Sequence, residues 1–284
     1  MAKKHLLIKP NYRQSDYQAV KPEKGGLEYL NFSAMKLKNG EYISGNTNNH
    51  EYVFVLLGGT VKVKIEGEVE EIIGDRQNVF KGMPYAVYLS LNTYYTLTSL
   101  SDETDIAYGH CEAVNKFPNK IIKPGNIDVE IRGGGNATRQ INNIVPPGFQ
   151  CDRLVVVEVY TPSGNWSSYP PHKHDEHKTD ADGNLIEADL EETYFYKIDK
   201  PGGYAIQQVY NNDRSLDEVV IAKDGDIVLV PEGYHPVVAA YGYNVYYLNF
   251  LAGSAQSLKA SFDPKHNWIN NNWSEKDTRL PMVK

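Results

Sequence analysis

The sequence contains very little cysteine. Only two of its 284 residues, Cys111 and Cys151, carry a thiol. Two cysteines are too few for a disulfide framework, and such low usage is typical of proteins in a reducing compartment. We therefore interpret both residues as free buried thiols and expect a cytoplasmic location.

Long apolar runs are missing as well. No stretch reaches the ~20 apolar residues that a helix needs to cross a bilayer. The first ten residues are basic but contain no sustained apolar region, so we expect no signal peptide there. The sequence therefore predicts a protein without a membrane partner.

An excess of positive charge is also absent. The chain has 29 lysines and arginines against 36 aspartates and glutamates, which gives a net charge of −7. Because nucleic-acid binding relies on basic patches, we expect no nucleic-acid partner. A hydrophobic content of 41% and a charged content of 23% are typical of a globular protein. The length is sufficient for one large or two ordinary domains.

Helical periodicity is the last feature that the chain lacks, because no long segment repeats its apolar residues every 3.6 positions. Instead there are 21 tyrosines, which suit pleated sheet, and many short apolar or alternating runs between Pro, Gly, Asn and Asp. In the first half these runs cover residues 51–57, 60–65, 85–90, 94–100 and 104–109. In the second half they cover residues 154–160, 193–198, 204–210, 218–222, 227–230, 237–240 and 245–250.

These runs predict an all-β protein with a sandwich or barrel in each half. Gly58-Gly59 separates the first two runs and predicts a hairpin between residues 51–57 and 60–65. The similar rhythm of the two halves favours a duplicated β-barrel.

The expected domain boundaries follow from composition. Lys123-Pro124-Gly125-Asn126 is a plausible linker between barrels. We therefore expect a first barrel over residues 1–125 and a second over residues 126–255. The polar tail over residues 256–284 is expected to pack on the second barrel.

Three consecutive glycines follow the linker, flanked by Arg132 and Arg139. The GxxxxGK[ST] pattern and a following helix are both absent, so a nucleotide phosphate loop is not expected. One interpretation is a turn between domains. The other is that an arginine holds a substrate carboxylate through a bidentate pair, with Arg139 the first choice and Arg132 the second.

The residues that indicate chemistry lie in the second half. His172 and His174 are two positions apart, so in a strand both imidazoles project from the same face. Glu192 begins an aromatic run, and a buried carboxylate there needs a partner. His235 follows a Pro-x-Gly turn. Three imidazoles and a carboxylate suit a divalent ion such as Zn, Mn, Fe, Co or Ni.

Each part of this group has a plainer interpretation. A lone HxH pair is often only polar surface, and His235 alone could be a hydrogen-bonded turn residue. Glu191 competes with Glu192 for the ligand role, and we prefer Glu192 because it adjoins the aromatic strand directly. His177 lies in the polar loop over residues 175–191 and is interpreted as solvated. The metal interpretation gains weight because the motifs occur in order within one β-rich domain.

The same residues resemble the two motifs of cupins, and more specifically the 5-deoxy-glucuronate isomerase family of inositol catabolism. The cupin resemblance consists of Gly164, His172-x-His174, Glu192, Gly225 and Pro231-x-Gly233-x-His235. The long loop after His174 and the single residue between Gly233 and His235 depart from common cupins but match that family. So do the segments over residues 132–139, 164–175, 233–240 and 246–253.

This resemblance implies a bicupin with two double-stranded β-helix (jelly-roll) barrels. The implied reaction is an aldose–ketose isomerisation of 5-deoxy-glucuronate to 2-deoxy-5-keto-gluconate, a small-molecule sugar acid. The implied metal ligands are His172, His174, Glu192 and His235. The first barrel has His50-Glu51 in place of an HxH pair, so we expect it to be a metal-free scaffold. A homodimer is expected, because bicupin edge strands often pair.

The group that moves the proton is not identified by the sequence. Tyr247, Tyr234, Lys173 and Asp175 are all candidates, whereas a metal-assisted hydride shift would need no such base. Alternative functions are another metal-dependent cupin, such as a 4-deoxy-5-ketouronate isomerase or a dioxygenase, and a non-enzymatic sugar-binding bicupin.

Overall fold

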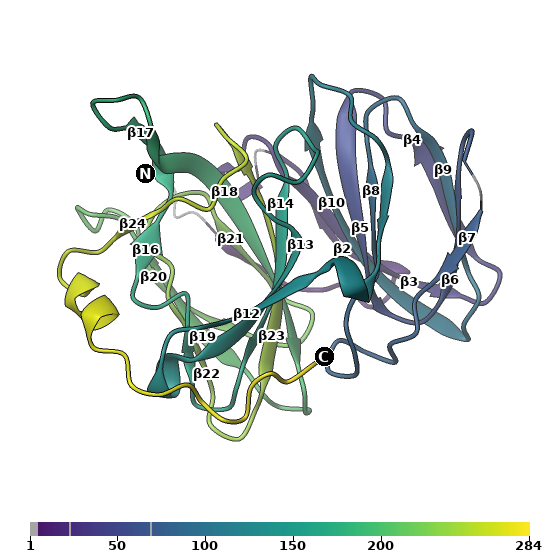
Figure 1. The fold of residues 1–284 in the computed structure, drawn as a ribbon. Coiled ribbons are helices and arrows are strands. Elements are labelled where there is room, and N and C mark those ends of the chain that lie inside the picture. The colour runs from purple at the N-terminus through teal and green to yellow at the C-terminus, as the bar shows by residue number, and fades with distance from the viewer. Residues whose placement is uncertain (1–4, 23, 69) are drawn as a thin grey trace.

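The computed structural model describes residues 5–22, 24–68 and 70–284. Two β-barrels lie side by side, with the first half of the chain in one and most of the second half in the other (Figure 1). In the described part of the chain, helix is limited to short 3₁₀ turns, and no helix is long and apolar enough to cross a membrane. The turns are η1 (Lys24–Gly26), η2 (Pro124–Asn126), η3 (Gly135–Ala137) and η4 (Asn267–Asn271).

The first barrel consists of two antiparallel sheets. The strand order of the larger sheet is β11-β8-β5-β10-β3-β2, and that of the smaller sheet is β4-β9-β6-β7. Their bounds are β2 (Asp16–Val20), β3 (Asn31–Lys38), β4 (Tyr42–Asn46), β5 (His50–Gly58), β6 (Val61–Ile65), β7 (Glu71–Ile73), β8 (Ala86–Leu89), β9 (Tyr94–Ser99), β10 (Glu103–Glu112) and β11 (Lys120–Ile122).

The second barrel repeats this arrangement. Its large sheet has the order β1-β21-β18-β23-β14-β13-β12, with β17 paired to β18; a smaller sheet has the order β15-β22-β19-β20, and β16 pairs with β24. The bounds are β1 (Leu7–Ile8), β12 (Asp128–Arg132), β13 (Arg139–Val145), β14 (Val155–Thr161), β15 (Trp166–Ser167), β16 (His172–Lys173), β17 (Asp175–Thr179), β18 (Leu185–Ile198), β19 (Ala205–Tyr210), β20 (Asp217–Ala222), β21 (Ile227–Val230), β22 (Val237–Ala239), β23 (Val245–Gly253) and β24 (Ser261–Phe262). The prediction of an all-β protein is confirmed.

The two large sheets pack face to face, which explains the most apolar runs in the sequence. Every residue of β14 is buried. Val156 and Tyr160 belong to the core between the barrels, whereas Val155 and Val157 belong to the interior of the second barrel. A strand that is buried on both faces has a nearly continuous apolar sequence, rather than an alternation of apolar and polar residues.

The predicted hairpin at Gly58-Gly59 is wrong. β5 pairs with β8 and β10, whereas β6 pairs with β7 and β9 in the other sheet of the same barrel. The chain crosses between sheets at this point. Gly59 has a φ of +91°, and a Cβ on Gly58 would lie 2.7 Å from the Gln77 carbonyl oxygen. The glycines therefore serve a tight corner of the barrel.

The predicted polar loop over residues 175–191 is also wrong. The segment forms a hairpin in which β17 pairs with the first part of β18. Its strands carry many charged side chains because they extend beyond the barrel (Figure 1).

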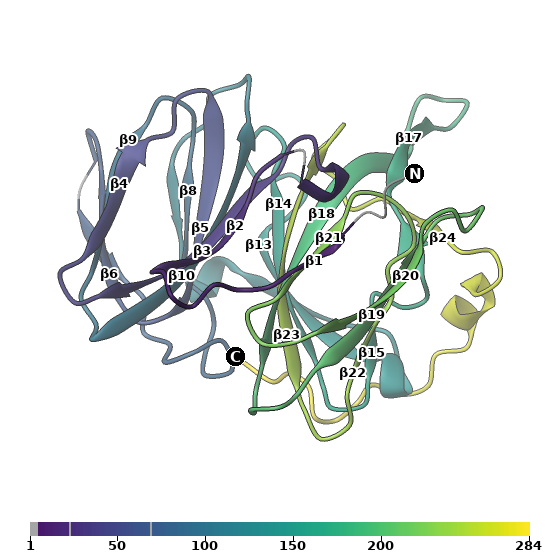
Figure 2. The same cartoon turned by 180° about the vertical axis from the view of Figure 1, so that it is seen from behind.

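The predicted division of the chain remains an interpretation, and strand pairing adds a detail to it. Leu7 and Ile8 pair with Val228 and Ile227, so β1 joins the sheet of the second barrel before the chain enters the first (Figure 2). The tail lies against the second barrel, because β24 pairs with β16.

Two buried carboxylates fasten the barrels to each other's loops. Glu51 in β5 accepts hydrogen bonds from the backbone N–H groups of residues 152–154 at 2.7 to 2.8 Å. Glu191 in β18 accepts from the backbone N–H groups of residues 28–30 at 2.5 to 2.7 Å. β5 and β18 hold equivalent places in their sheets, so the two contacts are related by the approximate symmetry of the barrels.

A buried ion pair crosses the same interface. The Arg76 guanidinium from the first barrel contacts the Glu158 carboxylate of β14 at 3.2 Å, and both side chains are at most 1% exposed. Glu158 also accepts hydrogen bonds from Asn142, Tyr160 and Tyr246. Its oxygens are thus satisfied without water.

We predict that Arg76→Met lowers the free energy of unfolding by about 3–5 kcal/mol, because it leaves the Glu158 charge buried without its partner. Urea denaturation measures the change. Lys36→Met is the matched control, since Lys36 pairs with Glu103 at the surface and should cost less than about 1 kcal/mol. Equal effects of the two substitutions would contradict the prediction.

Candidate metal centre

Three ligand-type side chains converge inside the second barrel. One donor atom each from His174, Glu192 and His235 lies within 4.8 Å of the others, and all three residues are buried. Glu192 Oε2 is 3.1 Å from His174 Nε2 and 3.4 Å from His235 Nε2. Bonds of about 2.0–2.2 Å to one ion separate neighbouring ligand atoms by about 3 Å. The spacing therefore fits ligands of a single ion.

His172 borders this group without joining its tightest part. Its ring centroid lies 4.9 Å from that of His235 and 6.3 Å from that of His174. Both HxH imidazoles thus lie on the side of the strand predicted from their spacing.

All three imidazoles are oriented in the same way. Each Nδ1 donates a hydrogen bond to a backbone carbonyl, which fixes the orientation of the ring and turns Nε2 toward the group. The pairs are His172 with Pro170 (3.3 Å), His174 with Leu190 (2.9 Å) and His235 with Gly233 (2.8 Å).

Burial is the largest influence on the titration of the group. Burial lowers the pKa of His172 to about 3 and that of His235 well below its ordinary value, so both are neutral at neutral pH. Burial raises the pKa of Glu192. Burial alone would lower the pKa of His174, but Glu192 raises it above the ordinary value.

One ligand-type atom of the group forms no hydrogen bond within the described residues. His235 Nε2 is buried and, within the described residues, makes no hydrogen bond. An unpartnered buried acceptor is costly in a folded protein. A divalent ion would use this lone pair and offset the Glu192 charge, so the residues present fit a metal such as Zn, Mn, Fe, Co or Ni.

A cavity of about 80 Å³ opens above this group and is lined by both predicted arginines. Arg139 is 5% exposed. Its Nη1 donates to the carbonyl oxygens of Tyr169 (3.0 Å) and Ala137 (3.3 Å), and it forms no salt bridge within the described chain. Burial lowers the pKa of its guanidinium to about 10. Arg132, by contrast, already binds Glu130 with two hydrogen bonds of 2.7 and 2.8 Å.

The cavity continues into a hollow of about 120 Å³ that the tail helps to enclose. Both spaces share Arg132, Arg139 and His172. Phe262 and Trp273 line the outer one.

Hydroxyl groups of Ser168, Tyr194 and Tyr247 also line the cavity. The Tyr247 hydroxyl hydrogen-bonds Ser167 Oγ and lies 3.5 Å from Ser168 Oγ, which in turn is 3.0 Å from the Tyr194 hydroxyl. Burial raises the pKa of Tyr247 above its ordinary value, although the serine hydroxyls and Arg139 oppose this. Tyr247 is therefore protonated at neutral pH.

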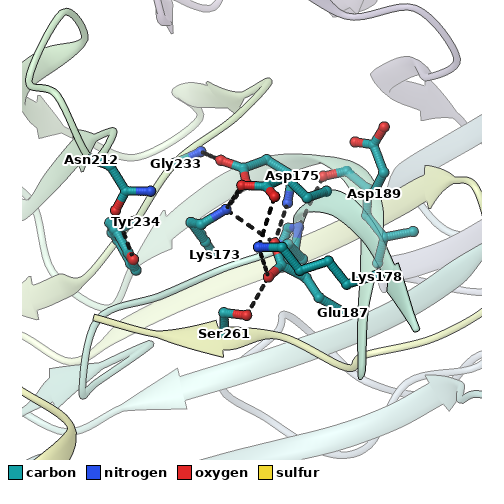
Figure 3. A network of polar contacts seen from close by, with 12 residues as sticks. Lys173, Asp175, Lys178, Glu187, Asp189, Asn212, Gly233, Tyr234 and Ser261 are labelled. Atoms are coloured by element: carbon teal, nitrogen blue, oxygen red, sulfur yellow. Dashed lines mark hydrogen bonds and ion pairs between the residues drawn. The ribbon is translucent and has the colours of Figure 1, made fainter. Parts of the chain in front are cut away.

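The other three candidates for proton transfer lie outside the cavity. Lys173 and Asp175 alternate with His172 and His174 along the chain, so their side chains point to the opposite side of the strand. They contact each other (Figure 3). Burial alone would lower the pKa of Lys173, but its hydrogen bonds to carboxylates raise it, which makes it a poor base. The Tyr234 hydroxyl donates to Asn212 Oδ1 at 3.1 Å.

The side chains of the two adjacent glutamates point in different directions. Glu191 faces the first barrel, as described above, and Glu192 faces the imidazoles.

The first barrel has a different residue at the position equivalent to Glu192. Because Glu51 corresponds to Glu191, Tyr52 occupies in β5 the place of Glu192. The Tyr52 ring stacks on His110 with centroids 4.2 Å apart. Aromatic packing thus fills the corresponding position, and the scaffold role of the first barrel stays a prediction.

Some residues at the cavity were not found from the sequence. Tyr194 and Asn249 both line it and pair across β18 and β23. Tyr194 is two positions after Glu192, so the period of a strand was a usable signal. Ser168 and Leu258 come from irregular segments and had no such signal.

Comparison with known sequences shows the family to which the chain belongs. A profile of the KduI/IolB family matches residues 6–269. The chain belongs to the KduI/IolB family. It is 44% identical over 254 residues to a 5-deoxy-glucuronate isomerase of Geobacillus thermodenitrificans, covering 88% of this chain and 89% of the relative. It is 37% identical to the protein of the same name from Bacillus licheniformis, covering 93% and 98%.

Solved structures agree with the barrel arrangement of this KduI/IolB protein. The crystal structure of an IolB-like protein from Salmonella typhimurium LT2 superposes with a TM-score of 0.88 at 37% identity, covering 94% of this chain and 99% of the other. Oxalate decarboxylase of Bacillus subtilis superposes with a TM-score of 0.63 at 11% identity, covering 92% and 80%, which shows a shared fold alone. The predicted bicupin fold is confirmed.

We predict that His174→Ala abolishes stoichiometric binding of a divalent metal, because it removes one of three converging ligand atoms. Elemental analysis of the purified variant measures this. His177→Ala is the matched control, since His177 is exposed and its Nδ1 contacts Ser254, and it should keep its metal. Full metal content in His174→Ala would refute the site.

Proposed function

We propose that this chain is a 5-deoxy-glucuronate isomerase that forms 2-deoxy-5-keto-gluconate in the degradation of inositol. The carrying observation is the 44% identity with an isomerase of that name along nearly the whole length of both chains. The cavity supports the proposal, because ligand-type residues, an unpaired arginine and a tyrosine hydroxyl line one small space. We place the enzyme in the cytoplasm and expect a homodimer, as inferred from the sequence.

The proposed metal ligands are His172, His174, Glu192 and His235. When bound, a divalent ion at this position would act as a Lewis acid toward the neighbouring carbonyl and hydroxyl oxygens of the substrate. The protein fixes the direction of the imidazoles through their Nδ1 hydrogen bonds.

Arg139 is the proposed partner of the substrate carboxylate. Its guanidinium is buried at the cavity and uses only carbonyl groups, so it keeps N–H donors and a full charge for an anion. Arg132 lies on the same cavity, and its charge is already balanced by Glu130. The carboxylate thereby orients the sugar, with its carbonyl end toward the histidines.

Tyr247 is the proposed proton-transfer residue, because it is the one of the four candidates that lines the cavity. Being protonated, it serves as the acid that donates a proton to a substrate oxygen as charge develops there, whereas the proton that leaves the neighbouring carbon needs a separate acceptor. Its hydrogen bond to Ser167 and its neighbour Ser168 provide a route by which that proton is replaced.

The proposal predicts turnover of 5-deoxy-glucuronate to the ketose by the metal-loaded protein, followed by NMR, and loss of turnover after chelation. In D₂O, proton transfer places deuterium on the carbon that becomes the hydroxymethyl group, whereas a hydride shift does not. Parallel samples with 4-deoxy-5-ketouronate, and with oxygen uptake recorded, test the alternative cupin activities. Absence of ketose with metal fully loaded would sink the isomerase assignment.

A second prediction concerns the carboxylate site. Arg139→Gln should raise KM by ten- to a hundredfold, because a hydrogen bond to a charged group contributes about 1.5–3 kcal/mol. Arg132→Gln should raise KM less than Arg139→Gln, because two N–H donors of Arg132 already form hydrogen bonds with Glu130. Steady-state kinetics at saturating metal measure both variants. The reverse order of effects would assign the carboxylate to Arg132.

A further inference from the structure

The side of the ligand strand that faces away from the cavity carries a buried ionic network (Figure 3). Lys173, between the two histidines, is 3% exposed, and Glu187 of β18 is fully buried. The Lys173 ammonium contacts the carboxylates of Asp175, Glu176 (2.9 Å) and Glu187 (3.2 Å). Burying these charges is costly, and a well-packed apolar contact would often be at least as stable. The network therefore indicates a task other than stability.

One arm of the network leads to His235. Asp175 Oδ2 accepts a hydrogen bond from the Gly233 N–H at 2.8 Å. The Gly233 carbonyl oxygen in turn accepts the Nδ1–H of His235 at 2.8 Å. Asp175 therefore holds the very turn whose carbonyl orients the third imidazole.

The other arm leads to the tail. Glu187 accepts hydrogen bonds from the Asp175 backbone N–H (3.2 Å) and from Ser261 Oγ. Ser261 lies in β24, where it pairs directly with Lys173 of β16. Glu187 thus joins the ligand strand, the barrel strand β18 and the tail strand.

These contacts matter because β16 has little sheet to hold it. It comprises only His172 and Lys173, and its ladder partner is the equally short β24. A two-residue ladder fixes a strand weakly, since few hydrogen bonds oppose its motion. Side-chain contacts to β18 therefore supply the anchoring that backbone pairing provides in longer strands.

We propose that Lys173, Asp175 and Glu187 are positioning residues, which hold the imidazoles of His172, His174 and His235 in the arrangement that binds metal. The inference rests on the metal centre of the proposed function. It removes Lys173 and Asp175 from the candidates for proton transfer, because both are engaged in the network and neither lines the cavity.

The test is the affinity of the purified, metal-stripped protein for Co²⁺, measured by competition with a chelator. Asp175→Asn and Lys173→Met should each weaken Co²⁺ binding by about ten- to a hundredfold, the usual effect of removing a group that orients ligands. The visible absorption of bound Co²⁺ should change, because the ligand geometry loosens. At saturating Co²⁺, kcat should stay within tenfold of the wild-type value.

Lys178→Met is the matched control. Lys178 also contacts Glu187, at 3.3 Å, but its side chain is 40% exposed, so its loss should change the Co²⁺ affinity by less than threefold. The double variant Lys173→Met/Glu187→Gln removes the ammonium together with the fully buried carboxylate, and Asp175 keeps its hydrogen bond from the Gly233 N–H. It should therefore fold, as checked by circular dichroism, and still bind Co²⁺ weakly.

The outcomes are distinguishable. Unchanged Co²⁺ affinity in Asp175→Asn and in the double variant would overturn the positioning role alone. A kcat that falls more than a hundredfold at unchanged Co²⁺ affinity would overturn it in favour of direct proton transfer. Failure of the wild-type protein to bind Co²⁺ would overturn both this inference and the proposed metal centre.

Discussion

The pocket depends on the alternation of side chains along one strand, β18. Successive residues of a strand point to opposite faces, and here each face has a separate task. Glu191 faces the first barrel and binds its backbone, whereas Glu192 faces the imidazoles. At the start of the same strand, Glu187 joins the ionic network behind the histidines. A shift of one residue in the register of β18 would therefore disrupt the interface and the site together.

Several buried charges in this protein are balanced by partners inside the protein, whereas two places differ. Glu51 and Glu191 are satisfied by backbone N–H groups, and Arg76 by Glu158. Arg139 lacks a carboxylate among the described residues, and the ligand atoms of His174, Glu192 and His235 converge in one buried group. Because an uncompensated buried charge is costly, the two unbalanced places are where ligands of opposite charge are expected. They open onto the same cavity, which is why a metal and a sugar acid form a consistent pair of ligands.

The sequence predicted the all-β architecture and the grouping of ligand-type side chains because both depend on local patterns. The HxH spacing and the Pro-x-Gly turn required no knowledge of the rest of the fold. The hairpin at Gly58-Gly59 failed because two glycines permit either a tight turn or a change of sheet, and pairing with distant strands decides between them. Lys173 and Asp175 were expected to transfer protons because of their residue type, and the direction of their side chains was not considered. The alternation that places His172 and His174 on one face already places these two on the other.

The position of β1 has a consequence for the modularity of the protein. All the proposed metal ligands lie in the second barrel, which invites the idea that it could be isolated as a small catalytic unit. Yet its edge strand β21 is covered by β1, and Lys9 contacts Asp226 across 217 residues of sequence. A fragment without that segment would expose the backbone groups of β21 as an open edge. The two barrels are duplicated in form, but they are not interchangeable parts, because the sheet of the second includes a strand from the start of the chain.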